Sequence, residues 1–271
     1  MSRLVVALLA ASSLAACATA GQSHANVDPS AGQPGREDQA QVANRQPDRR
    51  ARAAIVHQDM LTQMAFWAGE YDTFPNDLEA AQKFSECLRL AGRADRAVTV
   101  SGEALQRFPQ DPQLLRTYGL AQIASHDPQD ALRPLALLAQ ADAHDWKVRS
   151  ALGAALDQLG RYSEARQAYA EALAIQPNQV SVLINEGVSH LMEGDPAAAE
   201  PILRQAVSLP NAPPEARQNL AISLALQGKF GEAEQLERVD LPPAQVAANM
   251  DYLRSLLSDP HRWGDVGHNG R

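Results

Sequence analysis

The sequence predicts an all-α protein built from repeated pairs of antiparallel helices, and three observations lead to that prediction. Residues 146–179 carry two apolar stripes at helical spacing, the first ending at Gly160 and the second at Pro177. Small residues such as Gly153 and Ala165 stand where two helix backbones must approach closely. The pattern also recurs at a constant interval, in units that start at positions 78, 112, 146, 180 and 214. We therefore expect five stacked helical hairpins.

Three positions recur through these units. The turn between the paired helices falls on Gly92, His126, Gly160, Gly194 and Gly228. The small residue of the second helix is Ala97, Ala131, Ala165, Ala199 and Ala233. The small residue of the first helix is Ser85, Gly119, Gly153, Gly187 and Ala221. This pattern, including its interval, resembles the tetratricopeptide repeat (TPR), whose stacked helix-turn-helix units form a solenoid.

The N-terminus has the composition of a secretory signal. A basic start at Arg3 precedes an uncharged run from Leu4 to Ala16, which is too short to span a bilayer core of about 30 Å. The ending Leu14-Ala-Ala-Cys17 resembles the bacterial lipobox, so residues 1–16 are interpreted as a lipoprotein signal peptide. That resemblance implies acylation of Cys17, and Ala18 after it implies delivery to the periplasmic face of the outer membrane. The alternatives are a signal cleaved elsewhere and a buried apolar strand.

The segments on either side of the repeats differ from them in composition. Residues 17–51 lack aromatic residues, Leu and Ile, which predicts a disordered tether behind the lipidated cysteine. Residues 52–77 have helical periodicity outside the repeat register and are expected to form an N-terminal capping helix. Phe66 and Trp67 in it would be core residues or, alternatively, an exposed binding patch. The five repeats occupy residues 78–247, and a C-terminal capping helix and tail occupy residues 248–271.

Composition and motifs exclude several classes of function. The formal charge of −8 and the absence of a basic stripe argue against nucleic-acid binding. The common phosphate-loop, dinucleotide, zinc-protease and nucleophile-elbow motifs are absent, so we expect neither catalysis nor a cofactor. His261, Asp265 and His268 could be drawn as a metal site, but nothing in the tail would fix them, and no metal is predicted. Once Cys17 is acylated, Cys87 is a single thiol, interpreted as a small buried packing residue.

A candidate binding groove follows from the resemblance to TPR proteins. In that family the first helix of each repeat lines a concave face that holds a peptide, mainly through positions 2, 5, 6, 9, 12 and 13. Asn185 and Asn219 occupy the same position in adjacent repeats, and each amide could bond the backbone of an extended peptide. Alternatively, these asparagines are ordinary repeat consensus and the C-terminal helix covers the apolar residues. The predicted partner-binding residues are Ile184, Asn185, Val188, Leu191, Gln218, Asn219 and Ile222.

The C-terminal part carries a narrower resemblance. Residues 216–234, the break Asp240-Leu-Pro-Pro243 and the run 248–253 are similar to TadD, the TPR lipoprotein family of the tight-adherence (Tad/Flp) pilus and secretion system. The resemblance implies a non-catalytic, outer-membrane-anchored scaffold that supports assembly of that machine, with its secretin as a candidate partner. Ser85 and His126 depart from the repeat pattern only at packing positions.

Two other functions stay open at this point. The chain could be a TPR lipoprotein of another envelope machine, such as a type IV pilus pilotin, an outer-membrane assembly factor or a peptidoglycan-enzyme adaptor. It could also be an enzyme, which an activity lost on a point mutation would reveal.

Overall fold

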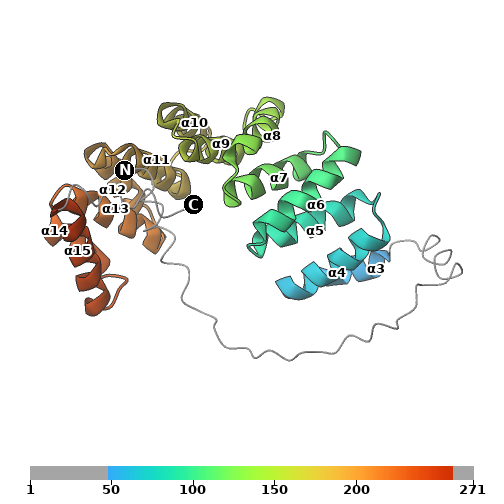
Figure 1. Cartoon of the computed structure of the whole chain (residues 1–271), viewed down its shortest axis with the longest axis horizontal. Helices are drawn as coiled ribbons and strands as arrows, with labels where there is room; N and C mark the ends of the chain where they lie inside the picture. Colours follow the sequence, from blue (N-terminus) through green and yellow to red (C-terminus); the bar gives the residue numbers. More distant parts are fainter. Residues whose placement is uncertain (1–47, 259–271) are drawn as a thin grey trace, which may run out of the picture. The chain divides into compact units, whose positions relative to one another are not determined.

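A computed structural model describes residues 48–258 of the chain, and within this range it contains helices and no strands (Figure 1). The predicted all-α helix-turn-helix solenoid is confirmed. The helices are α3 (Arg49–Ile55), α4 (Met60–Thr73), α5 (Leu78–Leu90), α6 (Ala94–Arg107), α7 (Pro112–Ala124), α8 (Pro128–Ala141), α9 (Trp146–Gln158), α10 (Tyr162–Ile175), α11 (Val180–Glu193), α12 (Pro196–Ser208), α13 (Pro214–Leu226), α14 (Phe230–Glu237) and α15 (Pro243–Ser258).

The described helices form two compact units. The N-terminal unit comprises residues 48–121 and the C-terminal unit residues 122–258, so the division falls inside α7. In the N-terminal unit α5 packs against α6, and in the C-terminal unit α9 packs against α10 and α11 against α12.

The turns between paired helices confirm the repeat register. All five predicted turn residues have a positive φ, a left-handed conformation that glycine adopts without a Cβ clash. His126 is the exception in residue type, and its φ of 61° is close to those of the glycines. At each turn the chain therefore reverses in the same way, whatever side chain it carries.

The small positions are as closely packed as the sequence predicted. The five alanines of the second helices, from Ala97 to Ala233, have no exposed surface. A Cβ placed on Gly153 would lie 2.4 Å from the Tyr169 ring, and one on Gly187 would lie 2.5 Å from Leu203 Cγ. Each glycine therefore makes room for a large side chain of the paired helix, at the same repeat position in both hairpins.

The N-terminal segment, expected to be one capping helix outside the register, is a shortened hairpin in register. Helix α4 starts and ends one repeat length before α6, and the shorter α3 precedes it. Trp67 of α4 stands three repeats before Tyr169 and is 1% exposed. The interpretation of Trp67 as a core residue is therefore confirmed.

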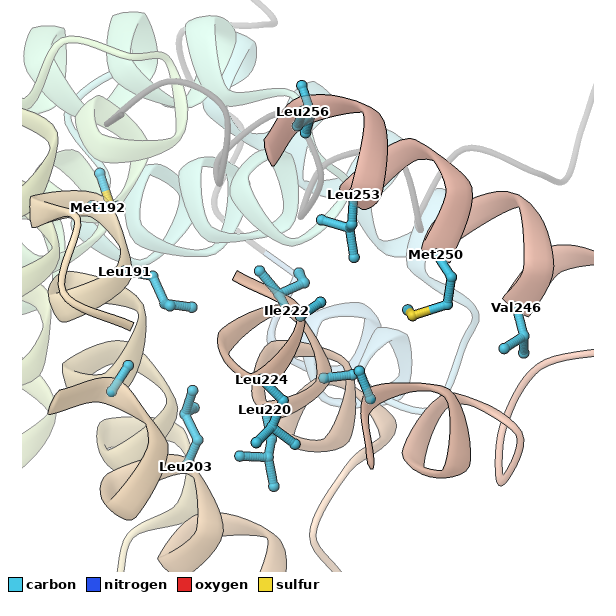
Figure 2. Close-up of a cluster of buried hydrophobic side chains, with 14 residues drawn as sticks. Leu191, Met192, Leu203, Leu220, Ile222, Leu224, Val246, Met250, Leu253 and Leu256 are labelled. Atoms are coloured by element: carbon cyan, nitrogen blue, oxygen red, sulfur yellow. The ribbon is translucent and has the colours of Figure 1, made fainter. Parts of the chain in front are cut away.

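The C-terminal helix α15 closes the second unit. It begins at Pro243, before the predicted start at 248, and packs against α13 and α14. Figure 2 shows Val246, Met250 and Leu253 projecting from α15 toward the side chains of α13. These three residues are almost completely buried, so α15 covers apolar surface that the last hairpin would otherwise expose to water.

Candidate functional site

The first helices of the hairpins in the C-terminal unit, together with α15, carry the candidate groove. When the first residue of each repeat is numbered 1, position 5 is Ser150 on α9, Ile184 on α11 and Gln218 on α13. Tyr252 on α15 continues this row after one further repeat length. Equivalent positions point alike from successive helices, so these four residues form one row across the unit.

Four of the predicted groove residues keep accessible surface. Ile184, Asn185, Val188 and Gln218 are half-buried. Tyr252, which the sequence analysis did not select, is 43% exposed and presents the largest side chain of the row. The register could have identified it, because it stands one repeat length after Gln218, but residues 248–271 were interpreted as a cap and tail.

The other three predicted residues lie in the core. Leu191 and Ile222 belong to the apolar cluster that also contains Met250 and Leu253 of α15 (Figure 2). For Ile222 on α13, which packs against α15, the structure supports the alternative of coverage by the C-terminal helix, whereas Leu191 lies on α11, which packs against α12 and α13. Asn219 is also 1% exposed, so its amide is not on the groove surface. Position within a repeat determines on which face of its helix a residue lies. It does not determine how far the next helix covers that face, so a residue predicted for the groove can be buried.

The two asparagines differ in their hydrogen bonds. Asn185 Nδ2 donates to Ser150 Oγ of the preceding repeat at 3.3 Å. The residue that stands in the same relation to Asn219 is Ile184, whose side chain cannot accept a hydrogen bond. Asn219 Oδ1 is buried and has no partner among residues 48–258. Asn185 is therefore the only one of the predicted pair that a partner could reach directly.

A buried polar network that the sequence analysis missed joins three helices beneath the groove. Asp157 of α9 accepts hydrogen bonds from Tyr169 Oη of α10 at 2.8 Å and from Ser189 Oγ of α11 at 2.6 Å. Burial raises the pKa of Asp157 to about 6, although both hydrogen bonds and the charge of Arg166 act in the opposite direction. Burial also raises the pKa of Tyr169, and the Asp157 charge adds to that effect. These groups bond one another, so the network connects adjacent repeats.

The remaining sequence predictions concern a thiol, a metal site and the anchor. Cys87 is buried, and burial raises the pKa of its thiol, as expected of a packing residue. Across 48–258, no three His, Cys, Asp or Glu side chains are placed to share a metal ion. In the same range no helix combines the length and apolar character needed to cross a bilayer. Cys17, His261, Asp265 and His268 lie outside the described residues.

Comparisons with known proteins agree with this fold. Residues 146–179 match one tetratricopeptide-repeat model, and residues 184–246 match a second. A crystal structure of a thermophilic TPR protein of Thermus thermophilus is 22% identical with a TM-score of 0.55, and the match covers 66% of this chain and 99% of that chain. With the five turns in register, these matches show tetratricopeptide repeats within residues 146–246 and a helix-turn-helix solenoid fold.

Two MamA structures are also similar. The one from strain MSR-1 is 25% identical with a TM-score of 0.49, over 55% of this chain and 85% of that chain. The one from Desulfovibrio magneticus is 20% identical with a TM-score of 0.49, over 54% of this chain and 82% of that chain. No curated protein sequence matches the chain significantly. The structural likenesses concern the fold alone.

Proposed function

We propose that this protein is a non-catalytic scaffold that binds an extended segment of a partner protein across α11, α13 and α15. The observation that carries the proposal is the accessible row formed by Ile184, Gln218 and Tyr252. Packed helices lie about 8–10 Å apart, and an extended chain advances about 3.3 Å per residue. A segment that crosses the row would thus meet a new helix about every third residue.

The accessible side chains define the chemistry of that segment. Ile184 and Val188 offer apolar contacts, and Tyr252 adds an aromatic ring with a hydroxyl group. Asn185 and Gln218 offer amides that can bond a peptide backbone. Residues 122–258 carry 17 acidic and 10 basic side chains, so the field of this unit favours a partner segment that is neutral or basic.

At a finer level, we propose a TadD-like lipoprotein of the Tad/Flp pilus secretion machine. Support comes from the lipobox at Cys17 and from the Leu-Pro-Pro break that precedes the closing helix α15. In this proposal the lipid holds the scaffold at the periplasmic face of the outer membrane, and the partner belongs to the pilus apparatus, with the secretin as first candidate. A TPR lipoprotein of another envelope machine is the alternative, and neighbouring pilus ATPase, secretin and pilin genes would favour the first assignment.

The groove is tested with the double variant Gln218→Ala and Tyr252→Ala. Both side chains are accessible, so folding should hardly change. Losing contacts of about 1–2 kcal/mol each should reduce recovery of the crosslinked partner from envelope membranes at least tenfold. Leu257→Ala, an exposed apolar truncation at another position of α15, is the matched control. Undiminished partner recovery and normal pili at normal protein abundance would place the binding surface elsewhere.

The anchor is tested separately with Cys17→Ser. Acylation requires the thiol, so the variant should leave the membrane fraction and accumulate as an unprocessed precursor of higher mass. Membrane retention at the wild-type mass would refute the lipoprotein assignment while leaving the groove proposal intact.

A further inference from the structure

The face of α4 opposite the buried Trp67 carries a row of residues that no part of residues 48–258 covers (Figure 1). Leu61, Ala65 and Gly69 stand four residues apart and therefore lie along one line of the helix. All three are exposed, Leu61 to 68%. We propose that these residues, the α4 row, form the interface of a dimer in which α4 of a second copy of this chain packs antiparallel around a two-fold axis at Ala65. The proposal concerns the N-terminal unit and does not depend on the groove described above.

The same repeat positions on the next second helix are polar. One repeat length after the α4 row, α6 has Asp95, Thr99 and Glu103, which are also exposed. Helix α6 thus presents the polar surface that is typical of a helix face in contact with water. A single exposed leucine is ordinary in a soluble protein. On α4, however, the whole row is apolar or small where its counterpart is polar, which favours a face that another element covers.

Neither the preceding segment of the chain nor a membrane fits this face. Residues 17–47 contain no Leu, Ile, Met or aromatic residue, so they offer no large apolar side chain to place against it. Residues 48–121 carry nine basic and ten acidic side chains, so this unit has no excess of positive charge for anionic lipid.

The row has the symmetry that contact with an identical copy requires. In a two-fold interface the same surface of both copies must be complementary to itself. Leu61 and Gly69 stand four residues on either side of Ala65, so an antiparallel copy centred on Ala65 places each Leu61 over the Gly69 of the other copy. No atom lies within 4 Å of a Cβ placed on Gly69, so a leucine side chain can rest directly on its backbone. The small side chain of Ala65 lets the two helices approach closely at the centre.

The distribution of charge also favours an identical copy. Near a two-fold axis a charged side chain faces its own counterpart, and such like-charge pairs are unfavourable. Residues 60–69 contain no charged residue, whereas the matching residues 94–103 of α6 contain three. Asp59 and Asp72 lie at the two ends of α4, where solvent screens them. The α4 row can therefore meet itself without like charges at the centre.

Sedimentation equilibrium of the full chain tests dimerisation, in a Cys17→Ser background so that no lipid contributes. A contact along one helix is smaller than the standard interface of about 800 Å² per partner, so we expect a reversible dimer with a dissociation constant on the order of 1–100 μM. Leu61→Glu places a charge at the interface and should raise this constant at least tenfold. Leu90→Glu is the matched control, because Leu90 is 55% exposed and lies on α5, and it should change the constant less than about twofold.

Cysteine pairing tests the antiparallel register. Under mild oxidation, a mixture of Leu61→Cys and Gly69→Cys chains should form a disulfide-linked dimer, because these two positions meet across the interface. Neither variant alone should do so, since its two cysteines would be about 12 Å apart along the helices, beyond the reach of a disulfide. Ala65→Cys should link to itself, whereas Thr99→Cys, at the matching position of α6, should not. Cys87 is buried and does not compete.

Three results would overturn the proposal. One is a monomer at every concentration up to about 200 μM. Another is an equal loss of dimer in Leu90→Glu. The third is self-linking of Leu61→Cys as rapid as linking in the mixture. If the chain is monomeric and Leu61→Glu instead abolishes capture of a different protein or binding to lipid vesicles, the face has another occupant and the dimer is rejected. Because Leu61 is exposed, the helical circular-dichroism signal of Leu61→Glu should match that of the wild type, and partner recovery through the C-terminal groove should be unchanged.

Discussion

At the scale of single residues, the turns between paired helices show the free-energy cost of a left-handed backbone conformation. His126 occupies a position where the other four turns have glycine, and its φ is 61°. A side chain with a Cβ is strained in the left-handed region by about 1–2 kcal/mol. His126 stands at the same repeat position as these glycines, and its turn adopts the same left-handed conformation.

His126→Gly should therefore stabilise the protein. Relief of strain, reduced by the greater entropy of glycine in the unfolded chain, should raise the free energy of unfolding by about 0.5–1 kcal/mol. The reverse change, Gly160→Ala, should lower it by about 1 kcal/mol. No atom lies within 4 Å of the added Cβ at Gly160, so this control isolates the conformational effect. Urea unfolding measures both, and a destabilised His126→Gly variant would contradict the argument.

A second prediction at this scale concerns Asp157. Its pKa is about 6 in the folded protein against 3.8 without burial, so the folded state binds this proton more tightly than the unfolded chain. The corresponding stability is fully present below pH 3.8 and is lost as the pH rises through about 6. Asp157→Asn keeps the shape and a neutral group, and should raise the free energy of unfolding at neutral pH by about 1–3 kcal/mol. The variant should also lose this part of the pH dependence, and an unchanged pH profile would contradict it.

At the scale of elements, the repeats show which features a sequence reveals. Five hairpins could be predicted because each carries a buried alanine and a turn residue at fixed spacing. The hairpin of α3 and α4 lacks both the turn glycine and the buried alanine, because Gln58 stands at the turn position and Gln63 at the alanine position. In the structure Gln63 Nε2 donates to the Gln58 carbonyl at 2.7 Å, so a side-chain amide helps to close this turn in place of a glycine. This hairpin therefore forms without the residues by which the other five could be predicted.

The predicted groove shows a second limit of sequence reasoning. Ile184, Asn185 and Gln218, selected by repeat position, retain accessible surface, as a groove residue must. Repeat position did not show that Asn219 and Ile222 are buried, because their burial depends on where helices of neighbouring repeats cross that face. Asp157 was missed for a related reason: its partners Tyr169 and Ser189 become neighbours only when three helices pack.

Close packing between paired helices can be tested at Gly187. An added Cβ would lie 2.5 Å from Leu203 Cγ, so Gly187→Ala should lower the free energy of unfolding by about 1–3 kcal/mol through overpacking. Gly231→Ala is the matched control, because nothing lies within 4 Å of that Cβ and alanine favours a helix by up to about 1 kcal/mol. Equal effects of the two changes, measured by chemical denaturation, would show that α11 and α12 do not meet at this residue.

At the scale of the whole molecule, the two units combine one architecture with different chemistry. In the N-terminal unit Arg52 lies among the carboxylates of Glu70, Asp77 and Glu79, whereas the C-terminal groove presents amides and apolar groups in an acidic unit. In a repeat protein each hairpin is stabilised chiefly by its neighbours, so the two surfaces can carry different residues without altering the shared core.

The same nearest-neighbour principle gives the last prediction, which concerns the closing helix α15. Leu253 is 1% exposed and belongs to the cluster that joins α15 to α13 (Figure 2). Leu253→Asp would bury an unpaired charge or detach the helix, at a cost of about 3 kcal/mol or more. Hydrogen exchange of backbone amides should therefore accelerate most in α11–α15 and least in α4–α6, because the perturbation passes from hairpin to hairpin. Leu257→Asp, on the exposed side of the same helix, should leave exchange nearly unchanged. A uniform acceleration over all helices would show that the protein unfolds as one cooperative unit and not repeat by repeat.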